Sequence, residues 1–388
     1  MKKLILFFGA IVLFVGLGLG NFKSSSSEYR ARVLETDNSS VTVAGIGRIG
    51  EQNLKIQVLN GPYKGEKLEI PNLLSGSLEY DEFYKEGDKI LAAVVERKGV
   101  LRGKALSLYR MDSVAGLGLM FVVFLILYAG KTGVKSIISF LASIGVLWKF
   151  FIPALKDGNN IFFITIITLI ILSAIIIFLV AGFTKKGIAA FLGTMTGLFV
   201  TTLLTFMFGG EFNLDGMNQP FAQGIAFTTN LNVSLLQIFY AAITLGASGA
   251  AMDIAMDMAA TVEELHINAS GMSRKDLVKS GFNVGKMVIG TMTTTLLLAY
   301  SGGCLTLLML FMQRNVSILQ ILNMKLVTSE IVKILIGSIG LVAVAPITAY
   351  ISAWIYTSEF EKKSNFLIKL FYSKKKECNL LNCITKLK

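Results

Sequence analysis

Long runs of apolar residues, separated by short polar stretches, dominate the pattern along this chain. A helix that crosses a bilayer core of about 30 Å needs about 20 consecutive apolar residues, and eight runs reach or approach that length. Seven of the eight contain no charged residue. The pattern therefore predicts a mainly α, polytopic membrane helix bundle of about eight spans. The runs are Leu4–Gly20, Val114–Gly130, Val134–Leu155, Ile161–Phe183, Ile188–Phe208, Val233–Ala251, Val288–Met312 and Ile334–Tyr356.

The first run begins with Met1-Lys2-Lys3 and continues through an apolar centre to small residues from Gly16 to Gly20. These features also fit a cleaved signal peptide, but the run lacks an A-x-A cleavage site. We favour an uncleaved signal-anchor span over residues 1–21. The cleaved peptide is the alternative.

A polar insert over residues 28–111 separates the first run from the other seven. Leu54–Val58 and Lys67–Ile70 alternate apolar and polar residues, as half-buried strands do. Further strands are expected over Lys89–Glu96 and Ala105–Tyr109. About five or six short strands in such an insert predict a small all-β domain, a closed barrel of the OB type.

The charges predict how the chain is oriented in the membrane. The chain carries 37 Lys and Arg against 25 Asp and Glu, a net charge of +12. With the N-terminus in the cytoplasm, the Lys- and Arg-rich short loops all lie inside, as in most membrane proteins. We therefore interpret the charge as basic cytoplasmic loops rather than as a sign of nucleic-acid binding.

This orientation defines four regions relative to the membrane. We expect the signal-anchor span, an extracytoplasmic β domain over residues 28–111, a seven-span bundle over residues 113–357 and a basic cytoplasmic tail over residues 358–388. Both termini are then cytoplasmic. The inside positions that decide this are Lys131, Lys135, Lys185, Lys186, Arg274, Lys275, Lys279 and Lys286, and residues 209–232 carry no Lys or Arg.

The densest polar feature of the membrane part lies at the end of the sixth run. Asp253 and Asp257 are four residues apart, so their carboxylates share a helix face about 6 Å apart. Two such groups could hold a cation or share a proton. The alternative is that the helix continues into the cytosol and that both aspartates are solvated there.

Small residues are expected to bring the sixth and seventh runs into close contact. Such residues permit close backbone approach, which is what stabilises helix pairs in lipid. On the sixth run they are Gly246, Gly249 and Ala250, and the glycines expected opposite them are Gly281, Gly285 and Gly290.

This packing predicts a partner for one aspartate. It brings Asp253 close to Asn283 or Lys286, at the predicted cytoplasmic end of the seventh run. Because an aspartate at membrane depth without a partner is costly, we expect Asp253 to be buried in the bundle against one of these two residues. Asp257, one turn closer to the cytosol, is expected to be more exposed.

The last two runs contain residues that interrupt helices. The seventh is polar at its centre, at Thr294 and Ser301, and then continues with Gly302 and Gly303. The eighth contains Pro346, which removes a backbone hydrogen bond and kinks a helix. Adjacent interrupted spans are typical of a transporter site at the membrane midplane. Ordinary kinked packing is the alternative.

Catalytic motifs are mostly absent from the sequence. His266 is the only histidine, which excludes an H-E-x-x-H zinc site. The three cysteines, Cys304, Cys378 and Cys383, offer too few ligands for a convincing metal site. An aspartyl protease that uses Asp253 and Asp257 is disfavoured, because its two carboxylates must converge on one substrate bond. We expect no enzyme activity, cofactor or metal.

Several motifs together resemble the YibE/YibF family of bacterial multispanning membrane proteins. The similarity covers nearly the whole chain and implies a bacterial cytoplasmic membrane protein, but it supplies no reaction. One position departs from the family pattern, in which an acidic residue follows the base; here Met287 follows Lys286. The motifs are Gly249-Ala-Ala-Met-Asp253, Asn283-Val-Gly285, Gly290-Thr-Met-Thr-Thr-Thr-Leu-Leu-Leu-Ala-Tyr300, Gly337-Ser-Ile-Gly340 and Pro346-Ile-Thr348.

Two function classes follow from these observations. The first is a permease or exporter of an ion or small solute, working within the bilayer. The second is a sensor or assembly partner whose outer β domain binds a ligand or a protein. The expected partners are lipid, a small ion or solute, and a second copy or another membrane protein, but no nucleic acid.

Overall fold

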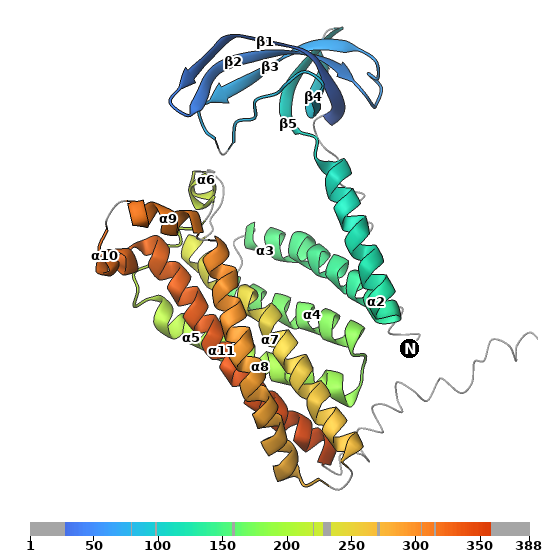
Figure 1. Ribbon diagram of the computed structural model, residues 1–388, viewed down its shortest axis with the longest axis vertical. Helices are drawn as coiled ribbons and strands as arrows, with labels where there is room; N and C mark the ends of the chain where they lie inside the picture. The colour runs from blue at the N-terminus through green and yellow to red at the C-terminus, as the bar shows by residue number, and fades with distance from the viewer. Residues whose placement is uncertain are drawn as a thin grey trace, which may run out of the picture. The chain divides into compact units, whose positions relative to one another are not determined.

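The computed structural model describes residues 28–78, 80–97, 99–156, 160–219, 221–227, 234–269, 272–303, 305–313 and 316–357. The predicted first span and the predicted basic tail lie outside these residues. The chain divides into two compact units at Gly130 (Figure 1). The two units are described separately.

The first unit contains one antiparallel sheet of five strands in the order β3-β2-β1-β4-β5. The alternation predicted for the second and third strands is confirmed, since Leu54, Ile56 and Val58 are buried and pair with a strand whose Leu68 and Ile70 are also buried. The strands are β1 (Glu28–Ala44), β2 (Gly47–Val58), β3 (Lys67–Ser75), β4 (Lys89–Arg97) and β5 (Val100–Leu108).

The sheet curls but does not close. Gly103 of β5 lies directly against the Ile70 side chain of β3, since a Cβ atom on Gly103 would be 2.8 Å from Ile70 Cγ2. Within the part of the chain that the structure describes, however, no ladder of hydrogen bonds joins β3 to β5. The all-β domain is therefore confirmed, whereas a closed OB-like barrel is not.

A buried glutamine stabilises the interior of this sheet. The Gln52 side chain accepts a hydrogen bond from the backbone N–H of Tyr84 at 3.1 Å and donates one to the Tyr84 carbonyl at 2.8 Å. Asn72 Nδ2 donates to Gln52 Oε1 at 3.2 Å. These bonds satisfy polar groups in the core and fix the segment after β3 against the sheet.

The first helix among the described residues is α2 (Met111–Val146), which contains the boundary between the units at Gly130. The remaining elements are η1 (Leu147–Phe151), α3 (Ile152–Lys156), α4 (Ile161–Val180), α5 (Lys185–Gly209), α6 (Ala222–Ala226), α7 (Leu235–Asn268), α8 (Arg274–Gly303), α9 (Leu305–Gln313), α10 (Ile318–Asn323) and α11 (Lys325–Thr357).

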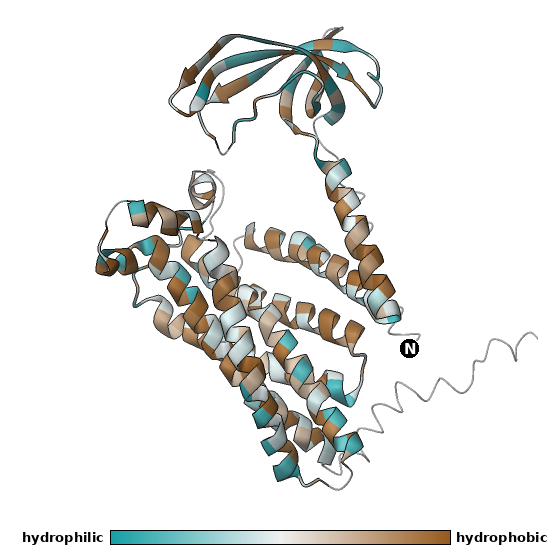
Figure 2. Cartoon of the chain, in the orientation of Figure 1, coloured by the Kyte–Doolittle hydropathy of each residue, from teal (hydrophilic) through white to brown (hydrophobic). Residues whose placement is uncertain are grey.

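Six helical segments among the described residues are long and apolar enough to cross a membrane. In Figure 2 these segments are mostly apolar, and the hydrophilic residues gather at the ends of α7 and α8. The second and third predicted spans form one candidate segment, Met111–Leu155. It is interrupted at Gly130, whose backbone is not helical (φ 54, ψ −125). The prediction of about eight spans is thus not confirmed.

The two predicted interruptions have different outcomes. The described part of α8 ends at Gly303 and α9 begins at Leu305, at the predicted Ser301-Gly302-Gly303 run, with residue 304 outside the described residues. Helix α11 continues through Pro346 as one element.

Helices α5, α7 and α11 form the centre of the bundle. Glycines on α5 and α11 allow these two helices to approach closely, because side chains of the partner helix occupy the space where a Cβ atom would lie. The pairs run antiparallel and are Gly193 with Thr348, Gly197 with Val344, and Gly340 with Thr201. Helix α8 packs against α7 and α11 on one side of this core.

Candidate functional site

The two aspartates of α7 lie on its exposed face. Ile254, Met258 and Val262 on the opposite face are fully buried, as their spacing predicts. Asp253 and Asp257 are both exposed. Neither carboxylate has a hydrogen-bond or ion-pair partner among the described residues.

The predicted burial of Asp253 is therefore wrong. Asn283 and Lys286 of α8 are also exposed, and neither forms a hydrogen bond with Asp253 within the described ranges. The reason is the rotation of α7 relative to α8. Gly281 and Gly285 of α8 face the Met258 side of α7, not the side that carries Asp253.

The glycine contacts show this rotation directly. A Cβ atom on Gly281 would lie 3.4 Å from Val262 Cγ2, and one on Gly285 would lie 3.3 Å from Met258 Sδ. By contrast, a Cβ atom on Gly249 or Gly290 would meet nothing within 4 Å. Gly246 is exposed as well. The predicted contact of Gly246 and Gly249 with the α8 glycines is thus not formed.

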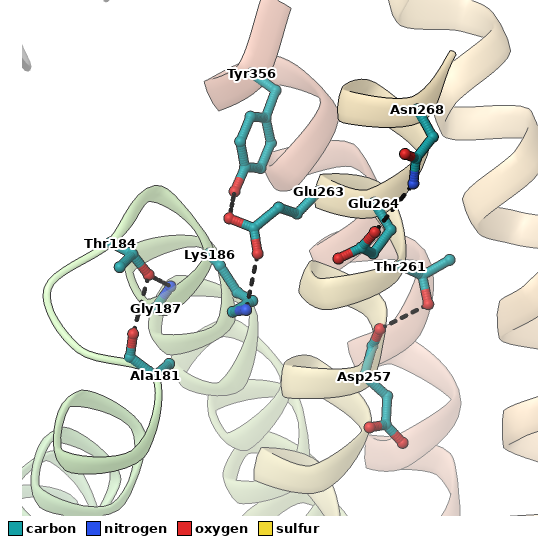
Figure 3. A network of polar contacts seen from close by, with 10 residues as sticks. All are labelled: Ala181, Thr184, Lys186, Gly187, Asp257, Thr261, Glu263, Glu264, Asn268 and Tyr356. Carbon is teal, nitrogen blue, oxygen red and sulfur yellow. Dashed lines mark hydrogen bonds and ion pairs between the residues drawn. The ribbon is translucent and has the colours of Figure 1, made fainter. Parts of the chain in front are cut away.

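A shallow groove continues the exposed acidic face toward the end of α7. Its volume is about 620 Å³, and Val288 of α8 forms part of its wall. Inside it, Asn268 Nδ2 donates to Glu264 Oε2 at 3.1 Å, and Thr261 donates to the backbone carbonyl of Asp257 at 2.8 Å (Figure 3). The Asp257 carboxylate points away from these groups in Figure 3.

Glu263, which the sequence reasoning did not single out, joins three helices. Its carboxylate forms an ion pair with Lys186 of α5 at 2.8 Å and accepts a hydrogen bond from the Tyr356 hydroxyl of α11 at 2.8 Å (Figure 3). We call Lys186, Glu263 and Tyr356 the Glu263 junction. The Lys186 and Glu263 side chains are only 29% and 23% exposed, so water screens this pair less than a surface pair.

Other contacts surround the Glu263 junction. The His266 ring lies 5.3 Å from the Tyr356 ring, and Lys185 Nζ lies 5.7 Å from the centre of the Tyr356 ring. Arg274 Nε at the start of α8 donates to Thr357 Oγ1 at 2.8 Å. These contacts tie the ends of α5, α7, α8 and α11 together at one end of the bundle.

An ion pair also fixes the opposite end of α11. Lys325 Nζ lies 2.8 Å from Asp215 Oδ2, in the loop after α5. The hydrogen bond from Lys325 and one from the backbone N–H of Met217 lower the pKa of the Asp215 carboxyl against a smaller opposing effect of desolvation. The Asp215 carboxylate therefore stays charged at neutral pH.

A second polar feature is a cavity of about 280 Å³ between α4, α5 and α7. One threonine from each helix lines it, and each of these hydroxyls donates to the carbonyl four residues earlier in its own helix. On one side, the Phe206 ring lies 4.8 Å from the Phe162 ring and 5.5 Å from the Tyr240 ring. The polar lining residues are Asn160, Thr165, Thr202, Gln237, Tyr240 and Thr244.

This cavity offers unused hydrogen-bonding groups without a formal charge. The Tyr240 hydroxyl and the Gln237 amide have no hydrogen-bond partner among the described residues, and the threonine oxygens retain lone pairs. The Asn160 amide oxygen accepts from the backbone N–H of Phe162 at 3.1 Å, which leaves its NH₂ group to donate. Among the residues that the structure describes, no Asp, Glu, Lys, Arg or His belongs to the lining.

Family comparison identifies both units of the chain. The model of the YibE/F-like protein family matches residues 117–358, and the model of the YibE/F family N-terminal domain matches residues 26–108. The chain belongs to the YibE/F family. The resemblance seen in the sequence motifs is thereby confirmed. No curated protein and no solved structure gave a significant match.

In this YibE/F-family protein, the other residues predicted for the site, on α8 and α11, do not form a common site. Thr294 is exposed and donates to the Gly290 carbonyl at 3.1 Å. A Cβ atom on Gly302 would meet nothing within 4 Å. Thr294, Ser301, Gly302, Gly303 and Pro346 do not line the cavity between α4, α5 and α7. Among the described residues, no group of three or more His, Cys, Asp and Glu side chains is placed to hold a metal ion.

The sequence contains signals for two features that we did not predict from it, namely the Glu263 junction and the cavity between α4, α5 and α7. The Lys185-Lys186 turn and the acidic end of α7 were assigned to the same side of the membrane, so an ion pair between them could have been expected. The threonines of the cavity occur in three different apolar runs, at Thr165, Thr202 and Thr244. Polar residues within spans suggest a polar interior, but only the packing shows which of them face one another.

Proposed function

We propose that this membrane protein is a permease for a small, uncharged polar solute, which binds in the cavity between α4, α5 and α7. The observation that carries the proposal is the lining of this cavity. Polar side chains within spans are costly, and in membrane proteins they concentrate along substrate paths. Ligand sites in bundles also lie between helices and have few, well-placed polar groups.

The chemistry of the lining indicates the class of solute. Thr165, Thr202 and Thr244 offer acceptor oxygens, and Gln237 and Tyr240 offer both donors and acceptors. A hydroxyl- or amide-bearing molecule can use both kinds of group. An ion lacks a counter-charge among these groups, because no charged side chain of the described residues belongs to the lining.

The size of the cavity indicates a small solute. Pockets for drug-sized ligands measure roughly 300–1,000 Å³, whereas this cavity measures about 280 Å³. The aromatic wall formed by Phe162, Phe206 and Tyr240 offers an apolar surface for the carbon atoms of such a solute. Glycerol and urea are therefore suitable first probes.

A flux assay tests the proposal. The full chain in liposomes should raise the rate of glycerol- or urea-driven swelling above that of protein-free liposomes, with no matching flux of Na⁺ or K⁺. The Thr202→Val and Thr244→Val variants keep the shape of the side chain but lose the acceptor oxygen. Each should lower the swelling rate by roughly fivefold to tenfold, the effect of one lost hydrogen bond.

A threonine outside the cavity serves as the matched control. Thr196 lies on the same helix as Thr202, is exposed, and makes the same kind of bond to its own helix, donating to the Leu192 carbonyl at 3.0 Å. Thr196→Val should leave the flux unchanged. Swelling no faster than in protein-free liposomes for every uncharged solute, with folded protein, would overturn the proposal.

A second function, binding of a ligand or protein by the β domain, rests on exposed apolar residues. Ile46, in the turn between β1 and β2, is 88% exposed. Ile49 pairs with Ser75, and Leu73, two residues from Ser75, shares that face of the sheet; both are exposed. Deletion of residues 28–110 separates the functions, because a permease keeps its glycerol flux whereas a sensor shows no flux in either form.

A further inference from the structure

One face of α7 remains uncovered along most of its length. It consists of Ala242, Gly246, Gly249, Asp253 and Asp257, all exposed. Spacings of three and four residues place them on one side of the helix. We call these residues, with Glu264 about two turns further on, the open face of α7. Its first half is small and its second half is acidic.

A face of this kind requires a covering element in a bilayer. Carboxylates that face lipid are costly and normally pair with a cation inside the protein. Small side chains leave room for a second helix to approach closely, which is a main source of helix association in lipid. Nothing lies within 4 Å of a Cβ atom built on Gly249, so the described helices leave that room unfilled.

We propose that the N-terminal apolar segment, residues 4–20, packs antiparallel along the open face of α7. Gly16, Gly18 and Gly20 then lie against Gly246 and Gly249. The basic residues Lys2 and Lys3 lie beside Glu264, at the far end of the acidic half. This segment precedes the residues that the structure describes, and the proposal is independent of the solute cavity.

The spacing of charges and glycines in the two segments matches. Fifteen residues separate Lys3 from Gly18, and fifteen separate Gly249 from Glu264. At 1.5 Å per residue, both distances are about 22 Å along a helix. An antiparallel pair that places Gly18 opposite Gly249 therefore places Lys3 opposite Glu264.

The direction is consistent with the ends of the bundle. The acidic end of α7 is joined to the Lys185-Lys186 turn through the Glu263–Lys186 ion pair. Such basic turns are cytoplasmic in membrane proteins, and so is a Lys-Lys start before an apolar run. The acidic end of α7 and the Lys2-Lys3 start of the N-terminal segment are thus expected on the same side of the membrane.

Charge also distinguishes this occupant from a second copy of the chain. Two open faces packed against each other would bring Asp253, Asp257 and Glu264 of both copies together, and like charges repel. The basic tail, residues 358–388, complements only the acidic half and offers no apolar segment of the length needed to cover Ala242 to Gly249. The N-terminal segment offers glycines to the small half and lysines to the Glu264 end of the acidic half.

Disulfide cross-linking in the full chain tests this arrangement. Cys304, Cys378 and Cys383 are first replaced by Ser. In that background, Gly18→Cys with Gly249→Cys should form an intramolecular disulfide upon oxidation in membranes, identified by mass spectrometry of the linked peptides. A fold control is Gly285→Cys with Ala345→Cys, because a Cβ atom on Gly285 would lie 3.5 Å from Ala345 Cβ, within the range for disulfides.

Two further variants distinguish the alternatives. Gly18→Cys with Phe199→Cys places the second thiol in the apolar groove of about 470 Å³ between α4 and α5, and it should not form a disulfide. Lys3→Glu should slow the 18–249 cross-link by roughly twofold to fivefold, the contribution of one exposed ion pair. Glu264→Lys in the same chain should restore it.

Four results would overturn the proposal. They are a mature chain that lacks residue 18, an 18–199 disulfide in place of 18–249, a disulfide between two copies, and failure of the 18–249 pair when the 285–345 control pair forms.

Discussion

At the scale of single residues, the acidic side chains of α7 differ in their contacts with other helices, and these contacts determine the role of each side chain. Asp253 and Glu263 lie ten residues apart on one helix, yet they face different surroundings. Glu263 contacts Lys186 and Tyr356 from two other helices. Asp253 is exposed and has no partner among the described residues. The first therefore contributes to the stability of the bundle, whereas the second marks an uncovered surface.

Replacement of Glu263 should destabilise the bundle. Glu263→Ala removes an ion pair and a hydrogen bond and leaves Lys186 without its partner, so we expect a loss of about 2 kcal/mol. Glu263→Gln keeps an acceptor for Tyr356 and should cost less. Glu264→Ala is the comparison and should cost less: that side chain is exposed, its partner among the described residues is Asn268 of its own helix, and beyond these it loses only the exposed pair with Lys3 proposed above. The shift of the unfolding midpoint in an SDS titration measures the effect, and equal shifts for Glu263→Ala and Glu264→Ala would contradict it.

A carboxylate in the β domain predicts a pH effect. Desolvation raises the pKa of Asp81, but hydrogen bonds from the Ser75 hydroxyl and from the backbone N–H groups of Ser75, Gly76 and Ser77 outweigh it, so the pKa is lowered. A lowered pKa in the folded state means stabilisation that is present above the unfolded value of about 4. It is lost as the pH falls through the folded value.

Hydrogen exchange of these amides measures this contribution. In the full chain, protection of the Ser75, Gly76 and Ser77 amides, corrected for intrinsic exchange, should fall as the pH is lowered below about 4. Asp81→Asn should reduce protection at neutral pH and remove most of its pH dependence. Unchanged protection in Asp81→Asn at pH 7 would show that the carboxylate contributes nothing there.

At the scale of elements, the sequence predicted the types of element better than their contacts. The alternation in Leu54–Val58 identifies a strand because one face is buried, and the apolar runs identify helices because their length matches a bilayer. Contacts between helices depend on how each helix is rotated about its own axis. An apolar run does not indicate this rotation when all faces of the helix are apolar. Gly246 and Gly249 were thus assigned to the α7–α8 contact, whereas the closest glycine contacts join α5 to α11.

The rotation of α7 also explains the wrong prediction for Asp253. Ile254, Met258 and Val262 form an apolar stripe at helical spacing, but Asp253 was expected to turn into the bundle with its neighbours. The stripe fills the side of α7 that meets α8 and α11, and the aspartates are left on the other side. The prediction of a closed barrel was not confirmed for a related reason. Alternation of apolar and polar residues shows which face of a strand is buried, but it does not show whether β3 and β5 form hydrogen bonds with each other.

The contact between α5 and α11 predicts a specific sensitivity. A Cβ atom on Gly197 would collide with the Val344 side chain, so Gly197→Ala should destabilise the bundle by about 1–3 kcal/mol, the cost of overpacking. Gly290→Ala is the matched control, because a Cβ atom there meets nothing within 4 Å and alanine favours a helix. Unfolding midpoints in the same SDS titration should fall for Gly197→Ala only. A similar midpoint for both variants would contradict the close packing.

At the scale of the whole molecule, membership of the YibE/F family and six candidate spans indicate a membrane protein. The two units differ in composition as well as in architecture. One is a sheet with an alternating surface. The other is a helical bundle with a polar cavity between three of its helices, lined by no charged side chain of the described residues. The proposed permease function depends on the second unit alone, which is why the deletion of the first is informative.

Blocking the cavity tests the proposed function most directly. In the chain whose native cysteines are replaced by Ser, Thr202→Cys places a thiol in the cavity lining, and Thr196→Cys places one on the exposed side of the same helix. Glycerol-driven swelling of proteoliposomes is measured before and after modification with a small methanethiosulfonate reagent. We predict that modification of Thr202→Cys abolishes the flux and that modification of Thr196→Cys leaves it unchanged. Full flux through the modified Thr202→Cys protein, with labelling confirmed by mass, would contradict the assignment of this cavity as the solute site.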